Sequence, residues 1–358
     1  MNRVTYSSPN KLTVGYRIPV KVNLSVGVER PHSFNREYKK VRGILSLKNP
    51  PDLMMDLSLM LAKKELWEVI RSEFDVPIGV LPHYAIFNES TGLDEAELLE
   101  RIEELFKSGV NFITIHCTPN HELLSLAKRT RAVPVTSRGG GIVLRDMILN
   151  QRKANVYELL FEDICKIAVQ HGGVINLGTS FRAGSVADGF DQAAKEELAV
   201  QARFCRMAKA YGAQVILEGP GHIPLHKLAD YHKKIKALEV PPMPLGPIVS
   251  DSDDDLDHIS SAIGAAQFMM TAKGGIINAI TAVEHKGGVP SQRHLAEGLR
   301  VAKLAAQIAS ATYSKEALQV EEDISKIRGV SESCVLDAKK SGCSRCGHVC
   351  PLLSSNYF

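Results

Sequence analysis

Short apolar runs rich in Val and Ile alternate with longer helical patterns along most of this chain. The runs are continuous rather than alternating in polarity, which suits strands buried on both faces, as in a parallel sheet. The expected strands are Val20–Val26, Leu53–Leu57, Val76–Leu81, Phe112–His116, Val133–Thr136, Val174–Gly178, Gln214–Glu218, Ile248–Asp251 and Gly275–Ile280. The clearest helical patterns between them cover Asp94–Ser108, Tyr157–His171, Gln192–Tyr211 and Leu295–Ile308. About eight or nine strand–helix units over roughly 300 residues predict an α/β fold, the (β/α)8 TIM barrel, with a doubly wound open sheet as the alternative.

The 358 residues divide into three expected segments. Residues 1–18 read as a loosely structured lead-in, residues 19–313 as the catalytic barrel, and residues 314–358 as a charged linker with a short cysteine-rich tail. A net charge of +3, evenly spread, gives no reason to expect nucleic-acid binding. No apolar run approaches the roughly 20 residues that span a bilayer, and residues 1–19 lack the apolar core of a signal peptide.

Cysteine usage points to a reducing compartment. Four cysteines are scattered singly, which is not a disulfide framework; they are Cys117, Cys165, Cys205 and Cys334. Together with the absence of a membrane or export signal, this predicts a cytoplasmic protein.

The other three cysteines, Cys343, Cys346 and Cys350, are bunched near the C-terminus. Thiolates are soft ligands that select zinc or an iron–sulfur centre over hard metals. Three thiolates on a four-iron cluster would leave one iron open to bind and activate a ligand. A structural zinc site, completed by His348 or Cys334, is the alternative.

Polar residues follow nearly every expected strand. They are Asp56, Tyr84, His116, Ser137-Arg138, Arg182, Glu218 with His222, Asp251, and Glu284-His285. Because all strand ends of a TIM barrel converge on one face, we expect these side chains to form one site.

The glycine-rich segment Ser137–Gly141 predicts a phosphate site. Glycines let backbone N–H groups approach an anion, a helix N-terminus favours negative charge, and Arg138 offers a bidentate contact. A second loop, Thr179–Ser185, could add hydroxyls and another guanidinium to the same anion. A flexible turn is the alternative.

His222 and His285 follow strands that lie near each other in a barrel, so the two rings could share a metal such as Zn, Fe or Ni. Ordinary hydrogen-bonding histidines are the alternative, and spacing alone does not rank His116, His226 or His258 as further ligands. The neighbouring Glu218 could act as a base, bind a ribose hydroxyl or orient another group.

Taken together, these blocks resemble the phosphomethylpyrimidine synthase family of non-standard radical S-adenosylmethionine enzymes, which make the thiamine pyrimidine. The resemblance covers residues 20–313 and 343–350 in the family's order. It rests on Val22-Asn23, Met55-Asp56-Leu57-Ser58, Pro77-Ile78-Gly79, Pro82-His83-Tyr84, Phe112–His116, Ser137–Gly140, Leu177-Gly178, Arg182, Gly184-Ser185, Glu218–Pro224, Leu245-Gly246-Pro247, Asp257-His258-Ile259, Ser261–Gly264, Glu284-His285 and the cysteine tail.

The resemblance implies a TIM barrel in a homodimer, with a 4Fe–4S cluster on Cys343, Cys346 and Cys350 that serves the partner's barrel. It implies Zn or Fe on His222 and His285, S-adenosylmethionine as cofactor, an electron donor, and a small phosphorylated substrate. Glu218 and His116 would line the reacting centre. The implied substrate contacts are Ser25, Met55, Tyr84, His116, Ser137, Arg138, Gly139, Thr179, Arg182 and Glu218.

Several positions depart from the family pattern. The second and third cysteines are separated by only Gly347-His348-Val349, one residue fewer than in the family. A substrate-contacting Asn appears as Ser25, an Asp as Thr179 and a Tyr as Met243. Because sites that hydrogen-bond a substrate discriminate strongly against mismatched ligands, these changes predict a divergent paralogue.

The default function is therefore a radical lyase that converts aminoimidazole ribotide to hydroxymethylpyrimidine phosphate in thiamine biosynthesis. The same radical chemistry with another product, such as 5-hydroxybenzimidazole, is the first alternative. A zinc-dependent barrel lyase or hydrolase and a non-catalytic ligand-binding barrel are further alternatives.

Overall fold

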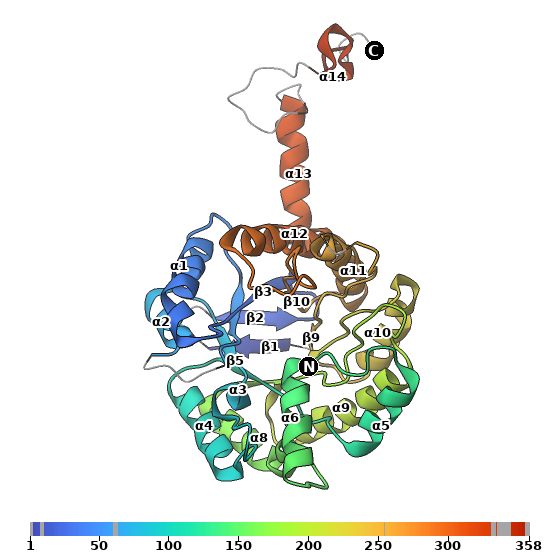
Figure 1. Cartoon of the computed structure of the whole chain (residues 1–358). Coiled ribbons are helices and arrows are strands. Elements are labelled where there is room, and N and C mark those ends of the chain that lie inside the picture. The colour runs from blue at the N-terminus through green and yellow to red at the C-terminus, as the bar shows by residue number, and fades with distance from the viewer. Residues whose placement is uncertain are drawn as a thin grey trace.

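Eight parallel strands form a closed barrel in the computed structural model, which describes residues 3–7, 11–59, 64–253, 255–330, 334 and 345–354 (Figure 1). The strands run in the order β10, β3, β4, β5, β6, β7, β8, β9, and a parallel bridge between Leu245 and Asn278 closes the ring. Their bounds are β3 (Lys21–Val26), β4 (Leu53–Asp56), β5 (Ile78–Val80), β6 (Phe112–Ile115), β7 (Val174–Leu177), β8 (Gln214–Glu218), β9 (Pro242–Met243) and β10 (Ile276–Asn278). The TIM-barrel prediction is confirmed.

Helices surround the barrel and bury one face each against it (Figure 1). Those between the strands are α1 (Phe34–Leu45), α2 (Leu66–Glu73), α3 (Pro82–Ile86), α4 (Glu95–Lys107), α5 (His121–Thr130), α6 (Arg138–Leu149), α7 (Val156–Leu159), α8 (Phe161–His171), α9 (Gln192–Ala210), α10 (Leu228–Lys236) and α11 (Asp257–Ala272). After β10 come α12 (Gln292–Ala311), α13 (Lys315–Val330) and the short α14 (Pro351–Ser354). Side-chain caps fix several starts, as where Asp94 accepts from the backbone N–H of Glu97 at 2.9 Å at the start of α4.

Two of the expected strands do not form, although the structure describes the residues of both. Residues 133–136 lie in the long connection between β6 and β7, where Pro134 has no N–H to donate to a ladder. Ile248 pairs only with His222, in the loop after β8. The strand that completes the barrel is instead β9. One of its two residues is Pro242, and a further proline lies on each side of the strand, so the sequence did not indicate a strand here.

An N-terminal hairpin replaces the loosely structured lead-in that the sequence suggested. β1 (Arg3–Tyr6) and β2 (Leu12–Gly15) pair antiparallel, and the Tyr6 ring packs edge-on against Phe112 with centroids 5.7 Å apart. The backbone N–H of Thr5 donates to Oε1 of Gln214, the first residue of β8, at 2.8 Å. Because Gln214 and Phe112 lie where β8 and β6 begin, the hairpin covers the N-terminal end of the barrel.

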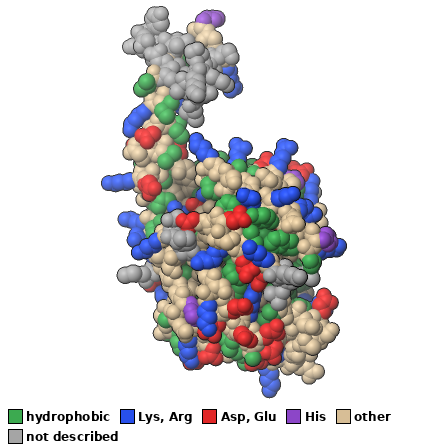
Figure 2. Space-filling model, turned by 90° about the vertical axis from the view of Figure 1, so that its left-hand side faces the viewer, with side chains coloured by type: hydrophobic (Ala, Val, Ile, Leu, Met, Phe, Trp, Pro, Cys, Tyr) green, Lys and Arg blue, Asp and Glu red, His purple; other side chains and the backbone are tan. Residues whose placement is uncertain are grey.

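Helix α13 contacts α12 at its start and then extends away from the barrel (Figures 1 and 2). It leaves apolar side chains exposed, namely Leu318, Val320, Ile327 and Val330. Over the side of the barrel seen in Figure 2, Lys and Arg are interspersed with Asp and Glu. Within the described residues, no helix is long and apolar enough to cross a membrane.

Candidate functional site

A cavity of about 390 Å³ opens where the barrel strands end. Nine of the ten predicted substrate contacts line it, and they are Ser25, Met55, Tyr84, His116, Ser137, Arg138, Gly139, Arg182 and Glu218. Sequence reasoning missed other lining residues, including Thr114 and Asn278 on the barrel floor and the ion pair of Glu37 and Lys40 on α1. Thr179 is not among the lining residues.

The glycine-rich segment forms the first turn of α6 beside this cavity. Oγ of Ser137 accepts from the backbone N–H of Gly140 at 3.1 Å, and the Arg138 guanidinium lies 5.9 Å from the Tyr84 ring centre. A Cβ on Gly139 would lie 2.3 Å from Nε2 of His116, so only glycine allows this approach. Backbone N–H groups of a helix N-terminus and a guanidinium thus face one cavity, the chemistry of a phosphate site.

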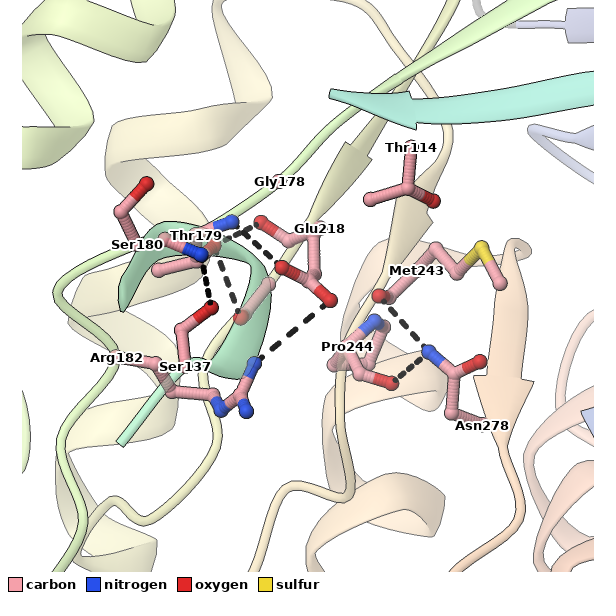
Figure 3. A network of polar contacts seen from close by, with 12 residues as sticks. Thr114, Ser137, Gly178, Thr179, Ser180, Arg182, Glu218, Met243, Pro244 and Asn278 are labelled. Carbon is pink, nitrogen blue, oxygen red and sulfur yellow. Dashed lines mark hydrogen bonds and ion pairs between the residues drawn. The ribbon is translucent and has the colours of Figure 1, made fainter. Parts of the chain in front are cut away.

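Glu218 ends β8 as a buried carboxylate. One of its oxygens accepts from the backbone N–H of Thr179 at 2.5 Å, and the other lies 3.7 Å from Nη1 of Arg182 (Figure 3). Burial raises the pKa of Glu218, while Arg182 and the Thr179 N–H act in the opposite direction. This carboxyl can therefore keep a proton at a higher pH than an exposed glutamate.

Thr179 points its hydroxyl away from the cavity. That hydroxyl donates to the backbone carbonyl of Glu218 at 2.9 Å and accepts from Nε2 of Gln201 at 3.2 Å. Thr179 therefore binds Glu218 on the side away from the cavity, whereas the sequence predicted that Thr179 contacts the substrate. Met243, on β9, is fully buried and is likewise absent from the cavity lining.

His116 stands at the end of β6 as a neutral imidazole. Burial holds its pKa well below the usual value, and the nearby His83 and Arg182 lower it further. His83 lies behind it with ring centroids 5.9 Å apart, bonded through Nδ1 to the hydroxyl of Tyr157 at 2.7 Å. Burial lowers the pKa of His83 to about 3, so this ring also carries no charge.

His222 and His285 come together as the sequence predicted. Their Nε2 atoms are 3.2 Å apart, and each Nδ1 meets a carboxylate, Asp251 at 2.6 Å and Asp257 at 3.0 Å. A carboxylate behind the ring aims the opposite nitrogen, an arrangement typical of metal-binding histidines. Two convergent imidazole nitrogens fit Zn²⁺ or Fe²⁺.

Among the described residues no group of three or more His, Cys, Asp or Glu side chains could hold a metal. The other candidate ligands do not join this pair. His116 is bonded to Ser180 through Nδ1 at 3.0 Å, and His258 faces Glu297 at 3.9 Å. His226 lies in the short turn η2 (Leu225–Lys227).

The C-terminal cysteines are described in part. Cys346 and Cys350 flank a single turn of 3-10 helix, η3 (Gly347–Val349), and Cys343 lies outside the described residues. Three thiolates in this short segment match the donor set of an iron–sulfur cluster. The buried cysteines of the barrel differ, since burial raises the pKa of Cys165 and Cys205 to about 12, as in core packing.

Comparison with known proteins identifies the family of this chain. Residues 1–356 match the model of the radical SAM ThiC family. The chain belongs to that family. Curated relatives named phosphomethylpyrimidine synthase include one from Pyrococcus furiosus, 29% identical over 368 residues (95% of this chain, 85% of the relative). Another, from Saccharolobus islandicus strain M.14.25, is 31% identical over 379 residues (97% of this chain, 86% of the relative).

A solved structure, Yersinia pestis DHPS with a pterine–sulfa conjugate, shares 12% identity at a TM-score of 0.46 over 87% of this chain and 98% of its own. Membership of the radical SAM ThiC family confirms the predicted resemblance and makes this chain a radical SAM enzyme of thiamine biosynthesis. It also implies a 4Fe–4S cluster and S-adenosylmethionine.

Proposed function

We propose that this enzyme converts aminoimidazole ribotide to hydroxymethylpyrimidine phosphate. The observation that carries the proposal is the cavity, which gathers nine of the ten expected substrate contacts around one anion site. Of the three substituted positions, Ser25, Thr179 and Met243, only Ser25 lines the cavity.

Each group has a task in this reaction. The N-terminus of α6, with Ser137 and Arg138, binds the phosphate, and Arg182 beside Glu218 adds positive charge to the same wall. Neutral His116 accepts or donates a hydrogen bond at the ring being rearranged, and Glu218 holds or moves a proton. When bound, the cluster and S-adenosylmethionine supply the 5′-deoxyadenosyl radical.

We also propose a divalent cation, Zn²⁺ or Fe²⁺, on His222 and His285, because both Nε2 atoms converge while aspartates orient both rings. A homodimer and a separate electron donor complete the proposal. The exposed apolar side chains of α13, a helix that leaves its own barrel, support a second copy that receives the tail.

The deciding experiment is anaerobic. The protein is reconstituted with iron and sulfide, reduced, given S-adenosylmethionine, and assayed for 5′-deoxyadenosine with and without aminoimidazole ribotide. Deoxyadenosine that rises with the ribotide, with the pyrimidine phosphate formed, supports the proposal. Deoxyadenosine that ignores the ribotide refutes the substrate and keeps the enzyme class.

The phosphate contact has a matched control on the same helix. Arg138→Ala should raise the KM for the ribotide by about 10–100-fold, since a charge-assisted pair is worth roughly 1.5–3 kcal/mol. Arg145→Ala removes an exposed guanidinium from α6 that pairs with Glu89 at 3.7 Å, outside the cavity, and should leave KM unchanged. Equal changes in KM in the two variants would contradict the assignment of Arg138 to the phosphate.

A further inference from the structure

Asn278, the last residue of β10, faces the inside of the barrel and lines the cavity. Its neighbours on the strand set this direction, because successive side chains point to opposite faces of a strand. Ile276 packs inside the barrel with Phe112, whereas Ile277 belongs to the core between the strands and the surrounding helices. Asn278 therefore places its side-chain amide at the floor of the cavity.

The orientation of this amide is fixed by the atoms around its nitrogen. Nδ2 of Asn278 donates to the backbone carbonyl oxygens of Met243 at 3.3 Å and of Pro244 at 2.9 Å (Figure 3). A carbonyl oxygen can only accept, so the amide cannot turn over without setting its own oxygen against two others. With two acceptors for its two N–H groups, the side chain keeps no donor for a ligand.

The oxygen of the same amide is held by a second asparagine. Asn23, which pairs with Asn278 in the register of β3 and β10, donates from Nδ2 to Oδ1 of Asn278 at 2.7 Å. An amide oxygen has two lone pairs. Among the described residues Asn23 is the one hydrogen-bond donor to this oxygen, so Oδ1 of Asn278 keeps a second lone pair for a ligand.

Asn278 lies across the barrel from the phosphate site. The closed order of the strands places β10 four places from β6 in either direction. The N-terminus of α6 lies at the end of β6, where Gly139 meets the ring of His116. A ribotide carries its phosphate and its base at opposite ends of the ribose. A ligand held by its phosphate beside α6 therefore directs its base toward the opposite wall, which is the position of Asn278.

We propose that Asn278 recognises the amino group of the substrate's base by accepting a hydrogen bond from it at Oδ1. This inference rests on the proposed function, which supplies a ribotide whose base is an aminoimidazole. The free ring nitrogen of that base is an acceptor, so the amino group is the one N–H donor that the base offers.

The proposal makes Asn278 a specificity-determining residue. A base with an oxo group in place of the amino group would set one acceptor against another and bind more weakly. Asn23 and the carbonyls of Met243 and Pro244 are the positioning groups, because they decide which end of the amide is presented to the ligand.

The test compares two ribotides that differ only in this group, aminoimidazole ribotide and imidazole ribotide. Calorimetric titration of the cluster-loaded protein, kept anaerobic and without S-adenosylmethionine, measures both affinities in the absence of turnover. We expect the unaltered protein to bind aminoimidazole ribotide about 10-fold more tightly, the scale of a neutral hydrogen bond to a buried acceptor. Equal affinities overturn the proposal.

Three variants assign the preference to one residue. Asn278→Val removes the acceptor and keeps a strand-forming side chain, so the preference should disappear. Asn278→Ala repeats the test without added bulk if valine disturbs the barrel. Asn176→Val is the matched control, because Asn176 is a buried amide on β7 that does not line the cavity, and it should keep the preference. A preference that survives both changes at Asn278 overturns the proposal.

This outcome is separable from that of the proposed function. Aminoimidazole ribotide that binds with the expected preference and is not converted refutes the proposed function and keeps the contact. Conversion without the preference refutes the contact alone, and failure of both ribotides to bind refutes both.

Discussion

His222 and His285 face each other with their Nε2 atoms 3.2 Å apart, and a carboxylate lies behind each ring. Two imidazoles in contact stabilise each other little, so we expect this arrangement to serve a ligand that both nitrogens bind. Removing a carboxylate behind a metal-binding histidine commonly costs about 10–100-fold in metal affinity. We therefore expect Asp251→Asn to weaken Zn²⁺ binding by that factor.

Calorimetric titration of the cluster-loaded protein measures this affinity, because the tail thiolates are then already occupied. Asp230→Asn is the control, since Asp230 is exposed on α10 and pairs only with Lys233 among the ion pairs of the described chain. Equal affinity in all three proteins would show that Asp251 does not orient a ligand.

Two glycines of α6 should respond oppositely to alanine. At Gly139 the new Cβ would lie 2.3 Å from His116, and such overpacking costs about 1–3 kcal/mol of stability and displaces the ring. At Gly141 nothing lies within 4 Å, so alanine should stabilise the helix by about 0.5–1 kcal/mol. Denaturant unfolding compares the two variants. Equal stability of Gly139→Ala and Gly141→Ala would contradict the close contact between Gly139 and His116.

The buried carboxyl of Glu197 should make stability depend on pH. Burial raises its pKa from 4.5 to about 7, so between these values the folded chain binds more protons than the unfolded chain. The stability that this group contributes is present below pH 4.5 and is lost as pH rises through about 7. Glu197→Gln does not titrate, so its melting temperature should rise relative to the unaltered protein between pH 5 and pH 8. A constant difference across that range would contradict the shift.

Tyr6 offers a test of the N-terminal hairpin. Its hydroxyl is buried and makes no hydrogen bond within the described chain, and an unsatisfied buried hydroxyl costs stability. Tyr6→Phe should therefore be neutral or stabilising by up to about 1 kcal/mol, whereas Tyr6→Ala should destabilise by about 3–5 kcal/mol. The urea concentrations at the unfolding midpoints distinguish these outcomes. Tyr16→Phe, at an exposed position, is the neutral reference. A phenylalanine variant that is clearly less stable would mean that the hydroxyl has a partner.

The barrel could be predicted because its strands are buried on both faces and so appear as continuous apolar runs, such as Phe112–Ile115. β9 escaped detection because proline supplies no N–H and usually ends a strand. The β1–β2 hairpin escaped because each strand has only four residues, too few for a period of two to stand out.

The site was predictable wherever a strand end carried a polar residue, as at Glu218 and His116. Thr179 shows the limit of that rule, since the chain turns its hydroxyl behind Glu218 and not into the cavity. Glu197 shows the opposite limit. It follows Glu196 in a helix, where two adjacent acidic residues predict a solvent-exposed face. It is buried because α9 packs against the loop after β7.

The hairpin that covers the N-terminal end of the barrel has a consequence for how ligands enter and leave the site. Tyr6 and its neighbours Val4 and Val14 close the end where the strands begin, so small molecules enter and leave by the same opening. Two ligands that share this cavity must then arrive in order of depth, the deeper one before the shallower, and depart in reverse.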